Sequence, residues 1–246
     1  MDEEELQSGL RLNKYMADSG FCSRREADRL IALGVVTIDG RVGVLGDIVL
    51  DDMEVLAAGE PLVPKSPEEK IYIALHKPVG IVCTADEREP LNVVTYLGHP
   101  ERVYPVGRLD KDSSGLLLLT NHGEIVNQIL RAGQRHEKEY VVTVNKPVTP
   151  AFLRTMASGV AILDRVTMPC KIRQVSKFTF RITLVQGLNR QIRRMCEALS
   201  YQVRTLQRVR IMNIHLGELG PGQWRDLTQE ELSELFRQLD GGFSRK

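Results

Sequence analysis

The most informative stretch of the sequence runs from Pro105 to Asn121 and reads PVGRLDKDSSGLLLLTN. It places a glycine, an arginine and two carboxylates, Asp110 and Asp112, in a predicted turn directly before a very apolar strand. A buried strand holds such a turn rigidly, which suits a site that needs an accurately placed carboxylate. The same residue types are also typical of a surface turn in which Asp and Ser side chains bond local backbone amides. From the residues alone, both interpretations stay open.

The regions around this stretch predict a domain of mixed strands and helices. The clearest strand is 178–185, where apolar residues alternate with polar ones, as in a sheet with one buried face. Further strands are expected at 71–75, 116–120, 140–144 and 204–214, and helices at 124–131, 150–157, 190–199 and 229–239. Their irregular, hairpin-like order favours an α+β fold with a mainly antiparallel sheet flanked by helices over a doubly wound parallel fold.

A separate small module is predicted at the N-terminal side. Ser23 and Glu26 form a capping-box pattern that begins a helix, and strands are expected at 35–38 and 53–58. The stretch 61–69 has three prolines among charged residues and predicts a linker. The expected organisation is a small domain over 1–62 with flexible residues 1–9, a linker over 63–70 and a larger domain over 71–240.

Composition restricts the class of protein. The chain has 246 residues, of which 42% are hydrophobic and 26% charged, as is ordinary for a globular protein of one small and one larger domain. No stretch approaches the roughly 20 apolar residues of a membrane span, and the acidic start MDEEELQSG lacks the features of a secretory signal. We expect a cytoplasmic protein with no membrane partner. The four cysteines form no CxxC pair, so we assign no metal and expect reduced thiols.

The formal net charge of +1 hides an uneven distribution. Acidic residues concentrate at both ends of the chain, whereas six arginines between 190 and 210 are opposed by Glu197 alone. Such a basic run can form a nucleic-acid-binding face whatever the total charge.

Five blocks of the sequence resemble, in the same order, the pseudouridine synthases that act on ribosomal RNA. The GRLD motif ending at Asp110 resembles their catalytic motif. The stretches RLNKY and SRREA, between 11 and 27, are similar to the S4 RNA-binding module. The stretch ALHKPVG (74–80) is similar to the opening strand and loop of the catalytic domain, and KEY (138–140) is similar to its tyrosine motif. The stretch NRQIRRM (189–195) is similar to its late arginine-rich helix. The stretches QGLN and MCE resemble the large-subunit subgroup called synthase F, which also fits Leu188, where many members carry Arg or Lys.

The resemblance implies an S4-like RNA-binding domain, a pseudouridine synthase domain and an isomerase that needs no cofactor. It assigns the role of nucleophile to Asp110, stacking on the uracil and help with proton transfer to Tyr140, and the ion pair with Asp110 to Arg193, with Arg190 as the alternative. A uridine inside an RNA helix must be extruded before it can react. A carboxylate nucleophile splits one difficult step into two easier ones. Whether Asp110 attacks C1′ or C6, or abstracts a sugar proton, stays open.

Seven basic residues are expected to contact RNA. In the larger domain these are Arg108, which either replaces the flipped base or contacts a phosphate, and Arg190 and Arg194. In the small module they are Lys14, Arg24, Arg25 and Arg29. Phosphate contacts orient RNA but carry little sequence information.

The predicted reaction converts one uridine of 23S ribosomal RNA to pseudouridine. The expected partner is a large-subunit stem-loop, with a transfer RNA of similar stem-loop as a second candidate, and the protein is expected to be a monomer. One alternative is a non-catalytic RNA-binding or ribosome-assembly factor, for which the S4-like module would suffice. Another is a sugar hydrolase with Asp110 and Asp112 as acid and base, because two residues on an extended chain place α-carbons roughly 6–7 Å apart. The set Asp110, Tyr140 and Arg193 favours the synthase.

Overall fold

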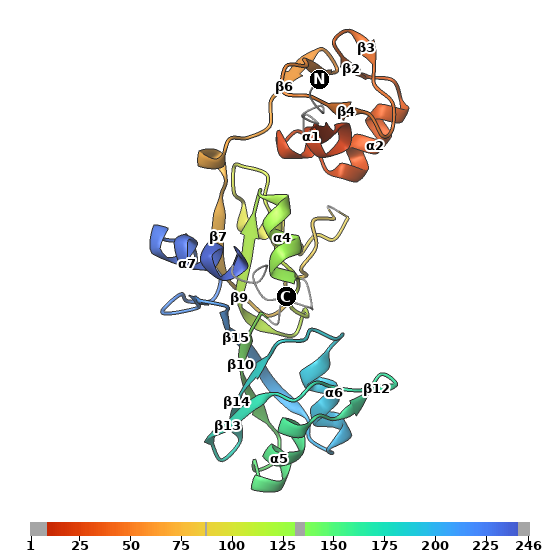
Figure 1. Ribbon diagram of the computed structural model, residues 1–246. Coiled ribbons are helices and arrows are strands. Elements are labelled where there is room, and N and C mark those ends of the chain that lie inside the picture. The colour runs from red at the N-terminus through yellow and green to blue at the C-terminus, as the bar shows by residue number, and fades with distance from the viewer. Residues whose placement is uncertain (1–8, 87, 131–135, 241–246) are drawn as a thin grey trace, which may run out of the picture. The chain divides into compact units, whose positions relative to one another are not determined.

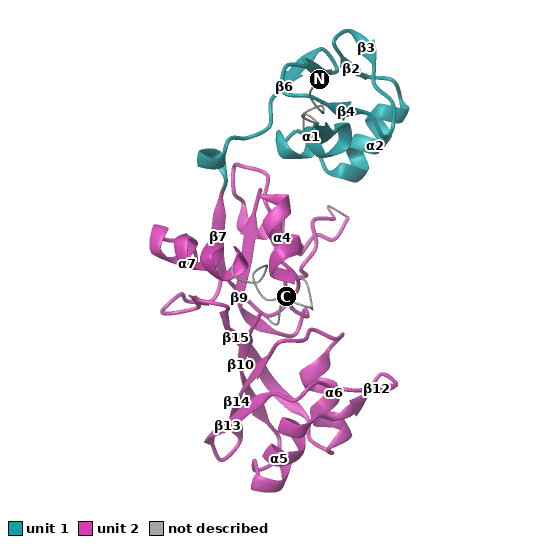
Figure 2. Ribbon diagram, in the orientation of Figure 1, with its two compact units in different colours: residues 1–70 teal, residues 71–246 magenta. Residues whose placement is uncertain are grey.

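The computed structural model describes residues 9–86, 88–130 and 136–240. The chain divides into two compact units, residues 1–70 and 71–246 (Figure 2). No helix within the described ranges is long and apolar enough to cross a membrane. Of residues 1–9, which were expected to be flexible, residues 1–8 lie outside the described residues, as does Arg131 at the end of one predicted helix.

The smaller unit packs two helices against short strands. Its elements are β1 (Leu10–Arg11), α1 (Leu12–Asp18), α2 (Arg24–Ala32), β2 (Val36–Ile38), β3 (Arg41–Val42), β4 (Ile48–Val49), β5 (Val55–Ala57), β6 (Glu60–Leu62) and the 3-10 helix η1 (Pro67–Glu69). The strands form an antiparallel sheet in the order β3-β2-β5-β6, and β1 pairs with β4. The predicted cap is confirmed, since the Ser23 hydroxyl accepts a hydrogen bond from the Glu26 amide at 3.1 Å. The stretch 61–69 is not wholly irregular, because it contains the end of β6 and η1.

The larger unit contains eleven strands and five helices within its described residues (Figure 1). The strands are β7 (Tyr72–Lys77), β8 (Tyr104–Pro105), β9 (Ser114–Thr120), β10 (Lys138–Val144), β11 (Ala161–Ile162), β12 (Arg165–Val166), β13 (Lys171–Ser176), β14 (Thr179–Leu184), β15 (Val203–Ile211), β16 (Ile214–His215) and β17 (Trp224–Asp226). The helices are α3 (Val93–Leu97), α4 (Gly123–Leu130), α5 (Pro150–Ser158), α6 (Gln191–Ala198) and α7 (Gln229–Asp240).

One large sheet organises this unit, in the order β13-β14-β10-β15-β9-β7-β17. Its pairings are antiparallel except where β15 meets β9, so the prediction of a mainly antiparallel sheet is confirmed. The parallel contact is short, joining Gln207 to Ser114 and Arg208 to Gly115. This contact joins β9, which begins just after the turn that carries Asp110, to a strand that is far away in the sequence.

Strand β9 is buried on both faces. Leu116 and Leu118 pack in a core with α4 and α7, whereas Leu117 and Leu119 pack in a second core with α3. A strand covered on both faces has an unbroken apolar run rather than alternation, which explains the four consecutive leucines. A third core joins β10 and β14 to α5 and α6, at the other end of the sheet (Figure 1).

The prediction of one strand over 204–214 is wrong. Strand β15 ends at Ile211, and the chain turns back through Met212 and Asn213 to form β16, which pairs with β15. Met212 has a φ of +50°, the left-handed conformation that tight turns require. The apolar residues on both sides of the turn hid it, because neither Gly nor Pro marks the position.

Candidate active site

The turn that carries Asp110 is fixed on both sides. At its start, the Val106 amide donates to the Leu118 carbonyl at 2.8 Å. The buried residue Leu109 donates its amide to the Cys83 sulfur at 3.3 Å. The Ser113 amide then donates to the Asp110 carbonyl at 3.0 Å and closes the turn. Asp110 therefore stands on a backbone held by buried groups, as a catalytic carboxylate requires.

Two buried cations also hold this region. Arg208, 2% exposed, donates from Nε to the Leu116 carbonyl at 2.7 Å and from a terminal nitrogen to the Arg108 carbonyl at 3.5 Å, so one guanidinium bonds both sides of the turn. The fully buried Lys77 donates to the carbonyls of Pro78 and Ile81 at 2.7 and 2.8 Å. Burial lowers the pKa of Lys77, and the charges of the nearby thiol and carboxyl groups partly offset this effect. Sequence reasoning missed both residues, although a charged residue in an apolar strand was an available signal.

The Asp110 carboxylate faces two guanidinium groups. Its Oδ2 lies 3.7 Å from a terminal nitrogen of Arg190 and 3.9 Å from Nε of Arg193. The Asp110 side chain is 31% exposed, and no described side chain or amide hydrogen-bonds to its carboxylate. Nε of Arg193 is buried and also lacks a hydrogen-bond partner among the described residues. The structure thus brings Asp110 together with both arginines named from the sequence.

Asp112 is the stronger partner of these arginines. Arg190 donates two hydrogen bonds to the Asp112 carboxylate, both at 3.1 Å. Arg193 donates to the Asp112 carbonyl at 2.8 Å and to the Ser113 hydroxyl at 3.1 Å. Burial raises the pKa of Asp112, but the hydrogen bond from Arg190 and the charges of Arg193 and Arg190 outweigh it, so the net pKa is lowered. A glycosidase acid needs a raised pKa, so the lowered pKa makes Asp112 unsuitable as the acid of the hydrolase alternative.

Tyr140 lies near the start of β10, where it is partly buried. It packs against two of the apolar cores, including the one that contains Leu109, the neighbour of Asp110. In the sheet register, Tyr140 pairs with Arg208, Arg208 with Gly115 and Gly115 with Lys77. The tyrosine and the two buried cations therefore occupy one row across four strands, beside the turn of Asp110.

The remaining basic residues named from the sequence have different surroundings. Arg108 is exposed on the turn, whereas Arg194 bonds back to the carbonyl and side-chain oxygens of Asn189 at 3.1 and 3.2 Å. In the small unit, Arg24 and Arg25 are exposed on α2, Arg29 pairs with Glu26 at 2.8 Å, and Lys14 pairs with Asp18 at 3.0 Å.

The six arginines between 190 and 210 do not form one basic face. Arg208 is buried, and Arg210 is engaged by Glu137 at 2.8 Å and Glu139 at 3.0 Å. The register of β10 and β15 shifts between Glu139 and Tyr140, so Arg210 and Arg208 pair with consecutive residues of β10 and lie on opposite faces of the sheet. A count of charges does not reveal this.

Across the described part of the chain, no group of three or more His, Cys, Asp or Glu side chains could hold a metal ion. The chemistry available is that of a carboxylate, a phenol and arginines on a rigid turn. That set suits a nucleophile, a base-stacking ring and charge balance.

The fold and this site define an RNA-modifying isomerase of the pseudouridine synthase class. Residues 71–198 match the family model described as RNA pseudouridylate synthase, and residues 10–55 match the S4 domain. The chain belongs to the RNA pseudouridylate synthase family, and its small unit contains an S4 domain.

Named relatives agree with this assignment. The chain is 53% identical over 237 residues to "Dual-specificity RNA pseudouridine synthase RluF" of Escherichia coli K12, covering 96% of this chain and 82% of the relative. It is 36% identical to "Ribosomal large subunit pseudouridine synthase B" of Bacillus subtilis, covering 94% and 98%. A solved structure titled "Crystal structure of pseudouridylate synthase" matches with a TM-score of 0.67 at 29% identity, covering 92% and 99%. The resemblance to the synthase F subgroup is confirmed. The alternative of a non-catalytic factor is not supported, because the named relatives are RNA pseudouridine synthases.

Proposed function

We propose that this enzyme modifies one uridine of 23S ribosomal RNA, extruding the base from its helix and using Asp110 as the nucleophile. The observation that carries the proposal is the Asp110 carboxylate, partly exposed, without a hydrogen-bond donor among the described residues and facing two guanidinium groups. The ribosomal target is supported by the name of the Bacillus subtilis relative. The reaction takes place in the cytoplasm, and the enzyme acts as a monomer.

The proposed reaction is an isomerisation in which no atom is gained or lost, and each site residue has a separate role in it. The N1–C1′ bond breaks, the base rotates, C5 joins C1′, and the proton lost from C5 is balanced by one gained at N1. Asp110 supplies the nucleophile, Arg193 balances its charge and Tyr140 stacks on the uracil and assists the proton transfer at C5. Arg108, on the same turn, enters the helix where the base has left or contacts a phosphate there. Arg194 contributes to RNA binding from α6.

The Asp110→Asn variant tests the nucleophile. We expect product formation to fall by about a thousandfold or more, because the amide cannot attack, while RNA binding changes little. Product is measured on in vitro transcribed 23S RNA as a carbodiimide-reactive base of unchanged mass, and release of free uracil would instead indicate a hydrolase. The matched control is Asp164→Asn, which removes an exposed carboxylate that pairs with no described residue. Turnover of Asp110→Asn within tenfold of the control would overturn the assignment.

A second RNA substrate is part of the proposal. The Escherichia coli relative is named for dual specificity, which supports two RNA substrates for this chain as well. A transfer RNA whose stem-loop resembles the ribosomal target is the second substrate that we propose. Transcripts of both RNAs, offered separately, test this point through the same carbodiimide assay.

A further inference from the structure

The ion pair of Arg190 and Asp112, joined by two hydrogen bonds, lies at the surface beside Asp110 rather than in the core. The side chains are 41% and 48% exposed, and the same Arg190 nitrogen that bonds Asp112 lies 3.7 Å from Asp110. An exposed pair of this kind contributes little to stability, so its partners can be exchanged.

The geometry of the pair is one that an RNA phosphate can reproduce. Arginine presents parallel N–H groups that fit the oxygens of a carboxylate or a phosphate equally well, and both contacts to Asp112 are 3.1 Å long. The Asp112 carboxylate thus binds the Arg190 guanidinium in the geometry that a phosphodiester would adopt.

Arg190 and Arg193 differ in how firmly they are held. Arg193 lies 3.4 Å from the Asp112 carboxylate, but it also donates to the Asp112 carbonyl and the Ser113 hydroxyl, so it stays in place if the carboxylate moves. Arg190 has only the carboxylates of Asp112 and Asp110 as ionic partners among the described residues. It also has a φ of +49° at the N-cap of α6, an unfavourable conformation for a residue with a Cβ. Arg190 is therefore the arginine that can change partner.

We propose that Asp112 occupies, before RNA binds, the position on Arg190 that a backbone phosphate next to the target uridine takes in the complex. The inference rests on the proposed function, because the ribose that reaches Asp110 carries phosphates on its own 5′ and 3′ oxygens. No bond to carbon changes in this step. The phosphate replaces the Asp112 carboxylate on Arg190, and the carboxylate also leaves Arg193 and turns to water. Asp112 thus competes with RNA and lowers the affinity for strands that cannot deliver a phosphate to Arg190.

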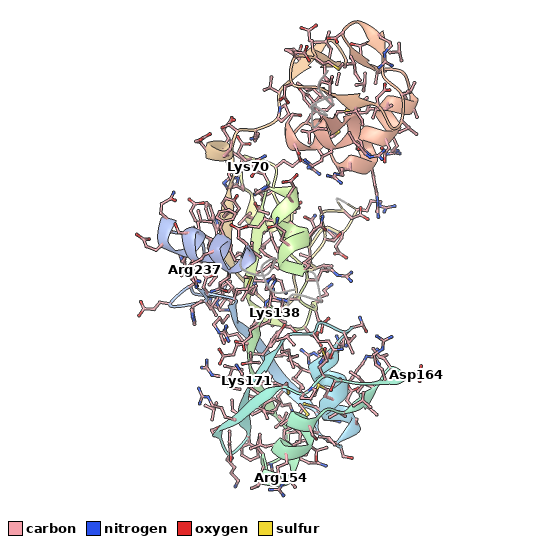
Figure 3. The ribbon with its side chains drawn as sticks, viewed as in Figure 1. Lys70, Lys138, Arg154, Asp164, Lys171 and Arg237 are labelled. Carbon is pink, nitrogen blue, oxygen red and sulfur yellow. The ribbon has the colours of Figure 1, made fainter. Side chains whose placement is uncertain are left out.

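The test is a set of dissociation constants for in vitro transcribed 23S RNA in a salt series, with full-length protein. Asp112→Asn keeps the size of the side chain and removes the competing charge, and we expect binding about two- to fivefold tighter than that of a charge control. The charge control is Asp164→Asn, which also removes one negative charge, in the turn of the β11–β12 hairpin (Figure 3). Its φ of +58° is one that asparagine tolerates. Asp112→Glu retains a carboxylate and is expected to bind like the wild type.

Arg190→Gln, alone and combined with Asp112→Asn, completes a double-mutant cycle for this ion pair. We expect this variant to bind more weakly with a salt slope shallower by about one, because one phosphate contact is lost. In that background, Asp112→Asn is expected to add nothing beyond the effect of Asp164→Asn. Binding of Asp112→Asn no tighter than the charge control, or a gain that persists without Arg190, would overturn the proposal. The nucleophile assignment is tested by turnover of Asp110→Asn, so the two ideas fail in separate assays.

Discussion

Lys138 shows how burial changes the chemistry of a single residue. It lies two residues before Tyr140 on β10 (Figure 3). Among the described residues, its ammonium group donates only one long hydrogen bond, 3.5 Å, to the His136 carbonyl. Burial, with a smaller contribution from the charge of Arg208, lowers the pKa of Lys138 to about 8. The folded protein therefore holds a lysine charge at neutral pH that its surroundings disfavour.

A stability measurement follows from this pKa. Between about pH 8 and pH 10.5, Lys138 binds more protons in the unfolded chain than in the folded chain. The contribution of Lys138 to the free energy of unfolding therefore rises with pH across that window. Lys138→Met removes the disfavoured charge, and we expect its free energy of unfolding at pH 7 to exceed that of the wild type by about 2–3 kcal/mol. The advantage shrinks towards pH 10.5.

Urea denaturation at pH 7 and at pH 10 measures this difference, with Lys177→Met as the control for removal of an exposed lysine charge. A Lys138→Met variant whose advantage is the same at both pH values would show that packing, rather than protonation, is responsible.

Among single residues, the placement of an arginine beside Asp110 was expected only from the resemblance of two short motifs to a known family, and the structure has Arg190 and Arg193 within 4 Å of the carboxylate. The expectation put Arg193 first and Arg190 second, whereas the two guanidinium groups lie at nearly equal distances from the carboxylate, 3.9 and 3.7 Å. The engagement of Asp112 was also missed. That contact joins positions 78 residues apart, and nothing in the spacing along one strand specifies it.

At the element scale, the close contact of β9 with β15 depends on Gly115. Its φ is +107°, and a Cβ there would lie 2.2 Å from the Arg208 carbonyl oxygen and 2.5 Å from its amide nitrogen. Both are backbone atoms, which cannot relieve the overlap by a change of rotamer as a side chain can. Gly115→Ala is expected to reduce the free energy of unfolding by about 2–4 kcal/mol, because the strands must separate and the residue must adopt a strained φ.

Chemical denaturation measures the effect of Gly115→Ala, and pseudouridine formation at a temperature where the variant stays folded reports displacement of the neighbouring turn. Gly187→Ala is the control, because an added Cβ at that glycine meets no atom within 4 Å. A Gly115→Ala protein as stable as this control would contradict the close approach of the two strands.

Elements with strong local signals were predicted well, and those defined by long-range pairing were not. Strand β9 and helix α4 follow from an apolar run and a helical period, and their ends agree within two residues. Strand β13 was missed because it is a largely exposed, charged edge strand without apolar alternation. The parallel contact of β9 with β15 was also missed, since its partners are about ninety residues apart in sequence and no local pattern records such a pairing.

At the scale of the whole molecule, each of the two units has an apolar core of its own. The core of the smaller unit is formed only by residues between Leu12 and Leu62, and the three cores of the larger unit only by residues from 71 onwards. A unit with a core of its own can bind RNA without taking part in the chemistry of the other unit. Two of its exposed basic residues, Arg24 and Arg25 on α2, pair with no described carboxylate and are candidates for phosphate contacts.

The double variant Arg24→Gln/Arg25→Gln tests this division of work. If both side chains neutralise phosphates, binding to 23S RNA weakens and the plot of log affinity against log salt becomes shallower by about two, because two fewer counterions are released. Turnover at saturating RNA is expected to stay near that of the wild type, since the turn of Asp110 belongs to the other unit. Arg154→Gln/Arg237→Gln, which removes two exposed cations of the larger unit (Figure 3), should leave the slope unchanged. Equal slopes for the two double variants would mean that the small unit binds RNA through other groups, whereas a loss of turnover at saturation would mean that it also positions the target uridine.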